Sequence, residues 1–369
     1  MTTGAGVRRV LMTTDTVGGV WTFTTELAES LGSRDIEVVL AALGGAPNSS
    51  QRSAAARIPI MRLLAGEFKL EWMDDPWLDV ERSGRWLLRL EEEYTPDLVH
   101  LNSFGHGALA WRTPIVITAH SCVSSWWAAV KREPLPPEWN RYCGLVAGSL
   151  KAADVVTAPS RAMAQTLAAS YGFDTSDCVV IPNGRRAALF RREPKQELIL
   201  TAGRLWDEAK NIQAIVDLAP RLSWPVYVAG EQRHPNGEYI SLQGCRALGQ
   251  LAADELADWY TRAAIYALPA RYEPFGLSAL EAALSGCALV LGDIASLREV
   301  WDDAAIFVPP EDCDALQSVL CALIDNDVLR NRMAERAMER SRAFTPERTA
   351  SEYLSAYQMA VDRRPACVS

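Results

Sequence analysis

The 369-residue sequence lacks any long hydrophobic run, since it holds no stretch of about 18 consecutive apolar residues. A segment that spans a bilayer is therefore not expected. Residues 1–10 also lack the apolar core and the cleavage site of a secretory leader, and they lead directly into a predicted strand. We expect a cytoplasmic protein, with peripheral contact at the inner face of the membrane left open.

Basic charge is also in deficit. The chain carries 37 Lys and Arg against 46 Asp and Glu, for a formal net charge of −9. Nucleic-acid binding needs an excess of basic side chains on one face, so we expect no nucleic-acid partner. Arginines do cluster within 185–192 and within 330–342, which leaves a local basic patch open.

Cysteines and histidines show no ligand spacing. None of the eight cysteines forms a Cys-x-x-Cys pair, and none stands beside a histidine at metal-ligand spacing. We therefore expect reduced, mostly buried thiols, with neither a disulfide framework nor a zinc site. Histidine is scarce, and the four residues of this type stand at positions 100, 106, 120 and 234.

What the sequence does contain is a long alternation of strand and helix patterns. Its length, with 49% hydrophobic and 22% charged residues, suits two soluble domains with sizeable cores. Apolar runs predict strands at 7–14, 36–43, 96–101, 114–121, 155–158, 178–181, 197–204, 225–230, 240–242, 265–269, 288–292 and 305–308. Helical patterns connect most of them, which predicts an α/β protein with parallel sheets and right-handed crossovers.

Segments between these runs divide the chain. The polar, turn-forming segment 182–194 marks a linker, so we expect one domain over 1–190 and a second over 191–345. Residues 58–93 carry a helical pattern with an aromatic interruption. Residues 124–139 read as irregular because prolines and tryptophans interrupt them.

The stretch 271–286 carries the strongest chemical pattern. Glu273 lies in a loop after an apolar strand, Gly276 frees the turn, and Glu281 lies within the helical repeat that follows. At a rise of about 1.5 Å per residue, the two carboxylates lie on the order of ten Å apart, about the span of a nucleotide sugar. The free N–H groups of the helix start between them suit a diphosphate. The alternative is an ordinary capped helix with two solvated glutamates.

Other candidate residues stand where predicted strands end. Gly18 and Gly19 form a strand–glycine–helix turn, which suits a phosphate but is also needed for steric reasons alone. His120 ends the 114–121 strand, where ligands gather in parallel sheets, although a single histidine is often structural. Trp126 and Trp127 would form either a sugar-stacking wall for an acceptor or a hydrophobic plug.

Arg204 and Lys210 flank a loop in the second half of the chain. Two cations beside a helix start suit a diphosphate leaving group, whose charge grows in the transition state. The alternative is a pair of solvated surface charges.

In order and spacing, these motifs resemble those of the retaining family-4 glycosyltransferases, enzymes of the two-Rossmann-domain, B-type architecture. The resemblance covers nearly the whole chain. The motifs are Asp15-x-x-Gly18-Gly19-Val20, Ala119-His120-Ser121, Ala158-Pro-Ser-Arg161, Ile181-Pro-Asn-Gly184, Ala202-Gly-Arg204 with Lys210-Asn211, and Glu273-Pro-Phe-Gly-Leu-x3-Glu281. Two loops depart from the family pattern: 292–299 lacks a glycine pair before Glu299, and 231–234 is compact.

The resemblance implies two Rossmann-like doubly wound domains facing each other across a cleft. It also implies that a C-terminal helix at 346–362 crosses back to the first domain, so that 346–369 belongs with that domain. The implied activity is retaining transfer of a hexose from a UDP- or GDP-linked sugar, such as UDP-glucose, to a hydroxyl acceptor. No metal and no cofactor are implied, and the departing phosphate oxygen would accept the acceptor's proton on the front face of the sugar.

The resemblance also implies a role for each motif residue. Glu273 would contact hydroxyls of the transferred sugar, and Glu281 would bind the nucleotide ribose. His120 would lie over the donor sugar near the anomeric carbon. The diphosphate would be held by the side chains of Arg204 and Lys210, by the backbone N–H groups of Phe275, Gly276 and Leu277, and by the close approach of Gly18 and Gly19.

Two alternatives of other classes stay open. One is a non-catalytic nucleotide-sugar or glycan-binding protein on the same fold, and the other is a sugar phosphorylase or epimerase of related architecture. The acceptor is not identified by any motif. The tryptophan-rich segments 66–77 and 121–139 would suit a small molecule, a glycan or a lipid-linked acceptor.

Overall fold

The computed structural model describes residues 6–232 and 242–364. The chain forms two compact units. The first comprises the chain up to Ala128, Glu133–Gly184 and the segment from Pro346, and the second comprises Ala129–Arg132 and Arg185–Thr345. The chain thus enters the second unit after Gly184, whereas the sequence placed this division after residue 190.

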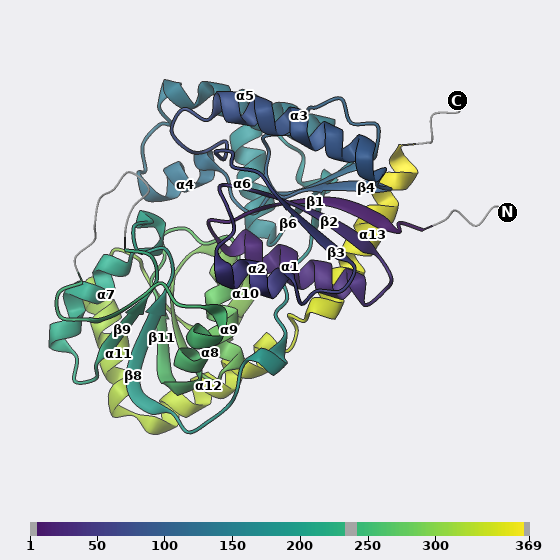
Figure 1. The fold of residues 1–369 in the computed structure, drawn as a ribbon. Helices are drawn as coiled ribbons and strands as arrows, with labels where there is room; N and C mark the ends of the chain where they lie inside the picture. Colours follow the sequence, from purple (N-terminus) through teal and green to yellow (C-terminus); the bar gives the residue numbers. More distant parts are fainter. Residues whose placement is uncertain (1–5, 233–241, 365–369) are drawn as a thin grey trace. The chain divides into compact units, whose positions relative to one another are not determined.

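The first unit is built on a parallel sheet of seven strands in the order β3-β2-β1-β4-β5-β6-β7. From β1 the chain builds outward through β2 and β3, and then returns to β4 on the other side of β1 (Figure 1). The carboxyl ends of β1 and β4 therefore meet at the reversal of strand order, where ligands bind in such sheets. The strands are β1 (Arg9–Asp15), β2 (Glu37–Leu43), β3 (Met61–Ala65), β4 (Leu98–Leu101), β5 (Ile115–Thr118), β6 (Val155–Ala158) and β7 (Cys178–Val180).

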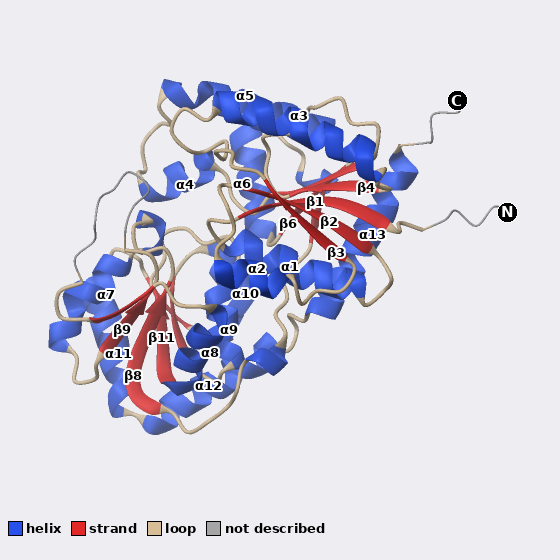
Figure 2. Ribbon diagram, in the orientation of Figure 1, coloured by secondary structure: helices blue, strands red, loops and turns tan. Residues whose placement is uncertain are grey.

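Helices lie on both sides of this sheet (Figure 2). Successive residues of β1 pack into the two different layers. In β1, Leu11 packs with the core under α3 (Trp77–Tyr94), α5 (Asn140–Ala152) and α6 (Arg161–Tyr171). Its neighbours Val10 and Met12 pack with α1 (Gly19–Gly32) and α13 (Pro346–Arg363). Strands buried on both faces read as continuous apolar runs, which is why the sequence located them.

The C-terminal helix α13 returns to the first unit, as predicted. Tyr353 and Tyr357 on this helix are fully buried against the sheet. The Tyr357 hydroxyl lies 2.8 Å from Nδ1 of His100, and the Tyr353 hydroxyl lies 3.0 Å from Oγ1 of Thr118. These buried polar contacts fix the position of the helix along β4 and β5, because each unpaired group would be costly in the core.

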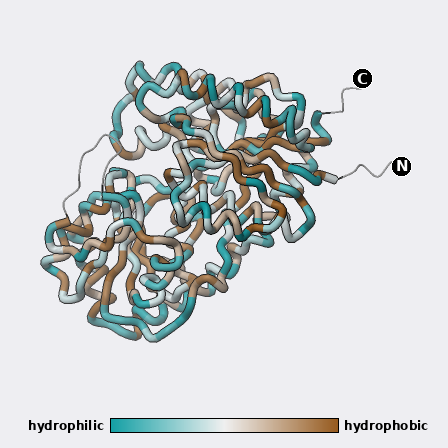
Figure 3. Tube along the Cα trace, viewed as in Figure 1, coloured by the Kyte–Doolittle hydropathy of each residue, from teal (hydrophilic) through white to brown (hydrophobic). Residues whose placement is uncertain are grey.

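The second unit has a parallel sheet of six strands in the order β10-β9-β8-β11-β12-β13 around one hydrophobic core. Its strands carry the most hydrophobic segments of the unit, and its helices alternate between hydrophobic and hydrophilic residues (Figure 3). The strands are β8 (Gln196–Ala202), β9 (Val226–Ala229), β10 (Arg246–Gly249), β11 (Ala263–Leu268), β12 (Ala288–Gly292) and β13 (Ile306–Val308). The helices are α7 (Ile212–Leu218), α8 (Ala253–Arg262), α9 (Leu277–Leu284), α10 (Ala295–Trp301), α11 (Cys313–Asp325) and α12 (Asp327–Ser341).

The two units are therefore Rossmann-like, doubly wound α/β domains, and this part of the sequence prediction is confirmed. In the second unit the strand order reverses between β8 and β11. The loops that follow these two strands carry Lys210 and Glu273.

Two segment predictions are wrong. Residues 58–93 are not one interrupted helix, because Met61–Ala65 pairs with β2 as the edge strand β3 and only Trp77–Tyr94 is helical. Residues 124–139 are not irregular throughout, since Val123–Val130 forms helix α4 before the prolines. The first error arises because β3 depends on pairing with a strand that is distant in sequence. The second arises because a proline restricts the backbone only at and just before its own position, so it does not prevent a helix earlier in the segment.

One helix was not predicted, and two predictions concern residues that the structure describes only in part. Helix α2 (Ser49–Ala55) was not predicted, although Asn48 and Gln51 form a reciprocal capping box at its start. Residues 240–241 of the strand expected at 240–242 and residues 233–234 of the compact loop 231–234 lie outside the described residues. Across the described ranges, no helix is both long enough and apolar enough to cross a membrane.

Candidate functional site

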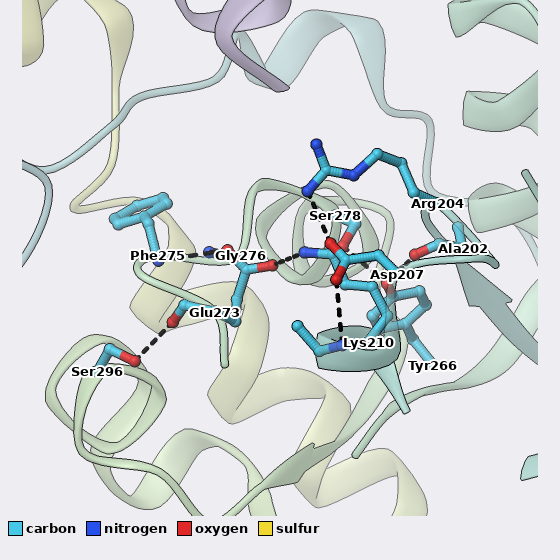
Figure 4. Close-up of polar contacts among 11 residues, drawn as sticks. Ala202, Arg204, Asp207, Lys210, Tyr266, Glu273, Phe275, Gly276, Ser278 and Ser296 are labelled. Atoms are coloured by element: carbon cyan, nitrogen blue, oxygen red, sulfur yellow. Dashed lines mark hydrogen bonds and ion pairs between the residues drawn. The ribbon is translucent and has the colours of Figure 1, made fainter. Parts of the chain in front are cut away.

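The turn between β11 and α9 holds Glu273 by its own backbone. Gly276 has φ +90, in the left-handed region that favours glycine, and it immediately precedes the first residue of α9. In this turn the Gly276 N–H donates to Oε1 of Glu273 at 2.9 Å, and the Ser296 hydroxyl donates to the Glu273 carbonyl at 2.5 Å (Figure 4). The sequence identified Glu273 and Gly276, but not Ser296, whose helix α10 follows a different strand.

Lys210 meets the same carboxylate from the neighbouring loop. Its Nζ lies 2.5 Å from Oε2 of Glu273, and the two side chains are only 17% and 12% exposed. The loop is tied to the end of β11 by Asn211, whose side-chain amide donates to the carbonyls of Pro269 and Pro310. The structure therefore brings together two residues that are 63 positions apart in the sequence.

Arg204 is anchored by an acid that the sequence analysis did not single out. One guanidinium nitrogen lies 2.7 Å from Oδ2 of Asp207, while Oδ1 of Asp207 accepts the N–H of Ala209 at 3.1 Å. Asp207 is buried, whereas the Arg204 side chain keeps 36% of its surface exposed. Asp207 thus holds one edge of the Arg204 guanidinium, while the side chain as a whole stays partly exposed. Asp207 lies three residues after Arg204, a spacing that could have indicated the pair.

Glu281 does not stand alone in its helix. Its Oε1 lies 2.8 Å from Nε of Arg185, with the side chains 12% and 9% exposed. Arg185 was noted in the sequence only as part of a basic cluster. The contact joins the start of the second unit to the middle of α9. The linear sequence could not indicate this pairing.

The three N–H groups expected to cradle a diphosphate differ in their present contacts. Those of Phe275 and Gly276 point to Oε1 of Glu273, at 3.4 Å and 2.9 Å. Leu277 is the first residue of α9. A bound anion at this helix start would therefore compete with the Glu273 carboxylate for backbone donors.

In the first unit, Gly18 and Gly19 form the turn between β1 and α1. Oδ1 of Asp15 accepts the N–H groups of Val17 and Gly18 at 2.9 Å and 3.0 Å, which closes the turn. Gly18 has an extended backbone with φ −146, so its conformation alone does not require glycine. The N–H groups of Val17 and Gly18 are thus engaged by Asp15, while Gly19 begins the helix.

His120 follows β5 in the same unit. Its Nε2 lies 2.8 Å from Oδ1 of Asn102, and its ring contacts that of Phe23 edge-on with centroids 4.7 Å apart. Burial lowers the pKa of His120 to about 3, because the charged imidazolium would lose its hydration. The imidazole is therefore neutral at physiological pH.

Trp126 and Trp127 lie next to each other on the short helix α4. Both are partly exposed, with ring centroids 6.2 Å apart and planes inclined by 56°. The Trp127 indole nitrogen is buried without a hydrogen-bond partner among the described residues. The structure thus places both rings side by side on α4.

Two further expectations concern metals and basic patches. Within 6–232 and 242–364, no group of three or more His, Cys, Asp or Glu side chains is arranged to hold a metal ion. The arginines of α12 are largely engaged: Arg330 donates to the Leu323 carbonyl, Arg340 donates to the Val300 carbonyl, and Arg336 pairs with Asp303. Part of the basic cluster at 330–342 therefore stabilises the second unit.

Family models match both units of the chain. The model "Glycosyltransferase Family 4" matches residues 17–188, and the model "Glycosyl transferases group 1" matches residues 196–326. The chain is 30% identical to the D-inositol 3-phosphate glycosyltransferase of Xylanimonas cellulosilytica, over 96% of this chain and 94% of that protein. It is 27% identical to the glycogen synthase of Mycobacterium tuberculosis, over 70% of this chain and 68% of that protein.

Solved structures share the fold at lower identity. The sucrose-phosphate synthase of Thermosynechococcus elongatus matches with a TM-score of 0.81 and 18% identity, covering 97% of this chain and all of that one. Anabaena HepE, solved in complex with UDP-glucose, matches with a TM-score of 0.74 and 18% identity, over 94% of this chain and 99% of that one. The chain belongs to the family-4-type glycosyltransferases of the two-Rossmann-domain, B-type architecture.

Proposed function

We propose that this glycosyltransferase moves a hexose from a UDP- or GDP-linked sugar to a hydroxyl acceptor, with retention of configuration and without a metal ion. The observation that carries the proposal is the contact between Lys210 and Glu273 at a helix start. In this proposal, the cation that would neutralise the diphosphate lies directly beside the carboxylate that would meet the sugar. The complex of Anabaena HepE with UDP-glucose supports a donor of this class.

In this proposal Arg204 and Lys210 neutralise the diphosphate. Negative charge grows on the leaving group as the glycosidic bond breaks, and two cations near a helix start stabilise that charge. Arg204 suits the task because Asp207 fixes one edge of its guanidinium while the side chain stays partly exposed. Side-chain cations would thereby do the work that a metal ion does in other transferases.

Glu273 would change partners when the donor binds. Its two carboxylate oxygens are held by Lys210 and by the Gly276 N–H, the same groups that we assign to the diphosphate. A diphosphate that takes these donors would free the carboxylate to accept hydrogen bonds from sugar hydroxyls. Glu273 would then orient the sugar rather than attack it, and the departing phosphate oxygen would accept the acceptor's proton.

Glu281 would bind the ribose. Arg185 contacts one carboxylate oxygen and so holds the side chain in place, which leaves the second oxygen for a ribose hydroxyl. In the first unit, we assign Gly18 and Gly19 to the donor phosphate and His120 to the sugar. Trp126 and Trp127 remain our candidates for contact with the acceptor.

The test is release of nucleoside diphosphate from a panel of UDP- and GDP-sugars, with and without candidate acceptors. We expect release by the wild type, with Glu273→Ala and Lys210→Ala lowering kcat/KM by about a hundredfold to a thousandfold. Glu339→Ala and Arg342→Ala are matched controls, because they break an exposed ion pair on α12 without touching the proposed site. Unchanged turnover in both site variants would exclude these residue assignments.

Four further measurements test retention, metal independence and the two alternative functions. NMR of the product should show the anomeric configuration of the donor, and turnover should survive a chelator. Nucleotide binding without transfer to any acceptor would instead favour a binding protein. Activity that depends on inorganic phosphate would favour a phosphorylase.

A further inference from the structure

A buried amide connects His120 to β1, an inner strand of the first sheet. Asn102 follows β4 and is only 6% exposed. Its side-chain nitrogen donates to the carbonyl of Thr13 at 2.8 Å, and its backbone N–H donates to the Thr13 hydroxyl at 2.9 Å. Its Oδ1 faces Nε2 of His120 at 2.8 Å. Asn102 is thus held at two points on β1 while its oxygen meets the imidazole.

These contacts determine which way the amide points. A backbone carbonyl can only accept a hydrogen bond, so the group that faces Thr13 must be the amide nitrogen. The oxygen of Asn102 therefore faces His120, and an amide oxygen can only accept. Nε2 of His120 must then carry the proton in this hydrogen bond.

We infer that Asn102 is a positioning residue that holds His120 in the Nε2-protonated tautomer and so leaves Nδ1 as a hydrogen-bond acceptor. This consequence rests on the function proposed above: a sugar hydroxyl that meets Nδ1 must be the donor of the hydrogen bond. The neutral imidazole has no proton at Nδ1 to give. His120 would therefore orient the donor sugar and would not act as a general acid.

The surroundings support a neutral ring. Phe23 contacts the rings of both His120 and His100, and it supplies neither a counter-charge nor a hydrogen-bond acceptor to replace the water that a buried imidazolium would lose. His100 is itself neutral, because burial and the nearby His120 lower its pKa to about 3. With both rings uncharged, the tautomer of His120 depends on its hydrogen-bond partner, and that partner is Asn102.

The direct test is ¹⁵N NMR of the imidazole nitrogens in the wild-type protein. The chain has only four histidines, so a His120→Gln variant identifies the resonances of His120. We expect a protonated Nε2, an unprotonated Nδ1 and no titration between about pH 5 and pH 8. An Nδ1-protonated ring, or a ring that titrates in this interval, would overturn the inference. This readout does not need a known donor, so it stands even if the proposed transfer fails.

Two variants extend the test to catalysis. Asn102→Asp places a carboxylate beside the ring, which favours the imidazolium and raises the pKa of His120. We expect turnover to fall on the acidic side of the raised pKa and to recover as the pH increases, because the imidazolium cannot accept at Nδ1. Asn102→Leu removes the acceptor, and we expect kcat to fall by on the order of tenfold to a hundredfold at every pH.

Ser83→Ala is the matched control for these variants. The Ser83 hydroxyl lies 2.8 Å from Nε2 of His106, so this change also removes a buried side-chain partner of a histidine in the same unit. We expect it to leave the pH profile and the ¹⁵N signals of His120 unchanged. If Asn102→Asp shows the same pH profile as Ser83→Ala, Asn102 has no positioning role and the inference fails.

Discussion

At the scale of single residues, three of the four charged residues assigned to the donor contact a partner that has no assigned role toward the donor, while the fourth, Lys210, pairs with Glu273. Asp207 anchors Arg204, Arg185 holds Glu281, and Ser296 holds the backbone of Glu273. Charged groups that are fixed before the ligand arrives lose less entropy when they bind it. The partners are therefore expected to influence donor affinity even though they need not touch the donor.

Arg185→Ala tests this expectation. It leaves the nearly buried Glu281 carboxylate without its cation, and we expect KM for the nucleotide sugar to rise about tenfold with a smaller effect on kcat. The measurement is steady-state kinetics with the best donor. Because removing one partner of a buried pair also destabilises the fold, Arg185→Met combined with Glu281→Gln serves as a second variant. An unchanged KM in a folded Arg185→Ala protein would contradict the assignment.

At the scale of elements, the strand ends are packed so closely that glycine is required. Gly230 ends β9 with φ +143, and a Cβ there would lie 1.7 Å from the carbonyl oxygen of Gly203. At Gly292, at the end of β12, a Cβ would lie 2.1 Å from the carbonyl oxygen of Ala270. The 292–299 loop lacks the glycine pair of the family pattern, but it keeps Gly292 at the position where a Cβ would clash with the backbone.

Gly230→Ala is expected to destabilise the second unit by more than about 3 kcal/mol, because backbone would have to move to admit the methyl group. Gly144→Ala is the contrasting change. Gly144 lies within α5, and a Cβ there meets nothing within 4 Å, so we expect a gain of about 0.5–1 kcal/mol. Urea titrations measure the free energy of unfolding of both variants. Equal changes in this free energy would show that the backbone clash does not cause the loss of stability in Gly230→Ala.

The polar contacts of α13 give a second prediction at this scale. Tyr357→Phe removes the hydroxyl that meets Nδ1 of His100 in the core, and we expect a loss of about 1–2 kcal/mol from the first unit. Tyr227→Phe is the control, because its hydroxyl meets Arg246 at an exposed position in the second unit. Chemical denaturation followed by tryptophan fluorescence compares them. An equal and small loss in both would mean that the buried contact does not stabilise α13.

At the scale of the whole molecule, the two units differ in their buried titratable groups. Burial lowers the pKa of His100 and His120 to about 3 and that of His106 to about 4, and all three lie in the first unit. Their ordinary pKa is 6.5, so the unfolded chain binds protons at a pH where the folded unit does not. Acid should therefore weaken the first unit.

Proton linkage gives the direction and the size of this change in stability with pH. As the pH falls below about 6.5, each neutral histidine costs about 1.4 kcal/mol of stability per pH unit until its folded pKa is reached. We expect the thermal midpoint of the first unit to fall steeply between about pH 6.5 and pH 4. His106→Gln should reduce this slope by about a third. Calorimetry at several pH values measures it, and a midpoint that stays constant from pH 7 to pH 5 would contradict the prediction.

The sequence alone determined the class of fold, most of the strands, and the family to which the chain belongs. These follow from local signals: apolar runs that must be buried, glycines at tight turns, and motifs whose residues lie within a few positions of each other. The turn that holds Glu273 and Gly276 could be read in this way.

Only the tertiary structure decided which residues hold the site in place. The contacts of Lys210 with Glu273, of Arg185 with Glu281 and of Asn102 with His120 all join segments that lie far apart in the sequence. The edge strand β3 likewise depends on its pairing with β2. Hydrogen bonds and ion pairs act over about 3–4 Å in space and leave no periodic trace along the chain, so only the folded sheets could bring these residues together.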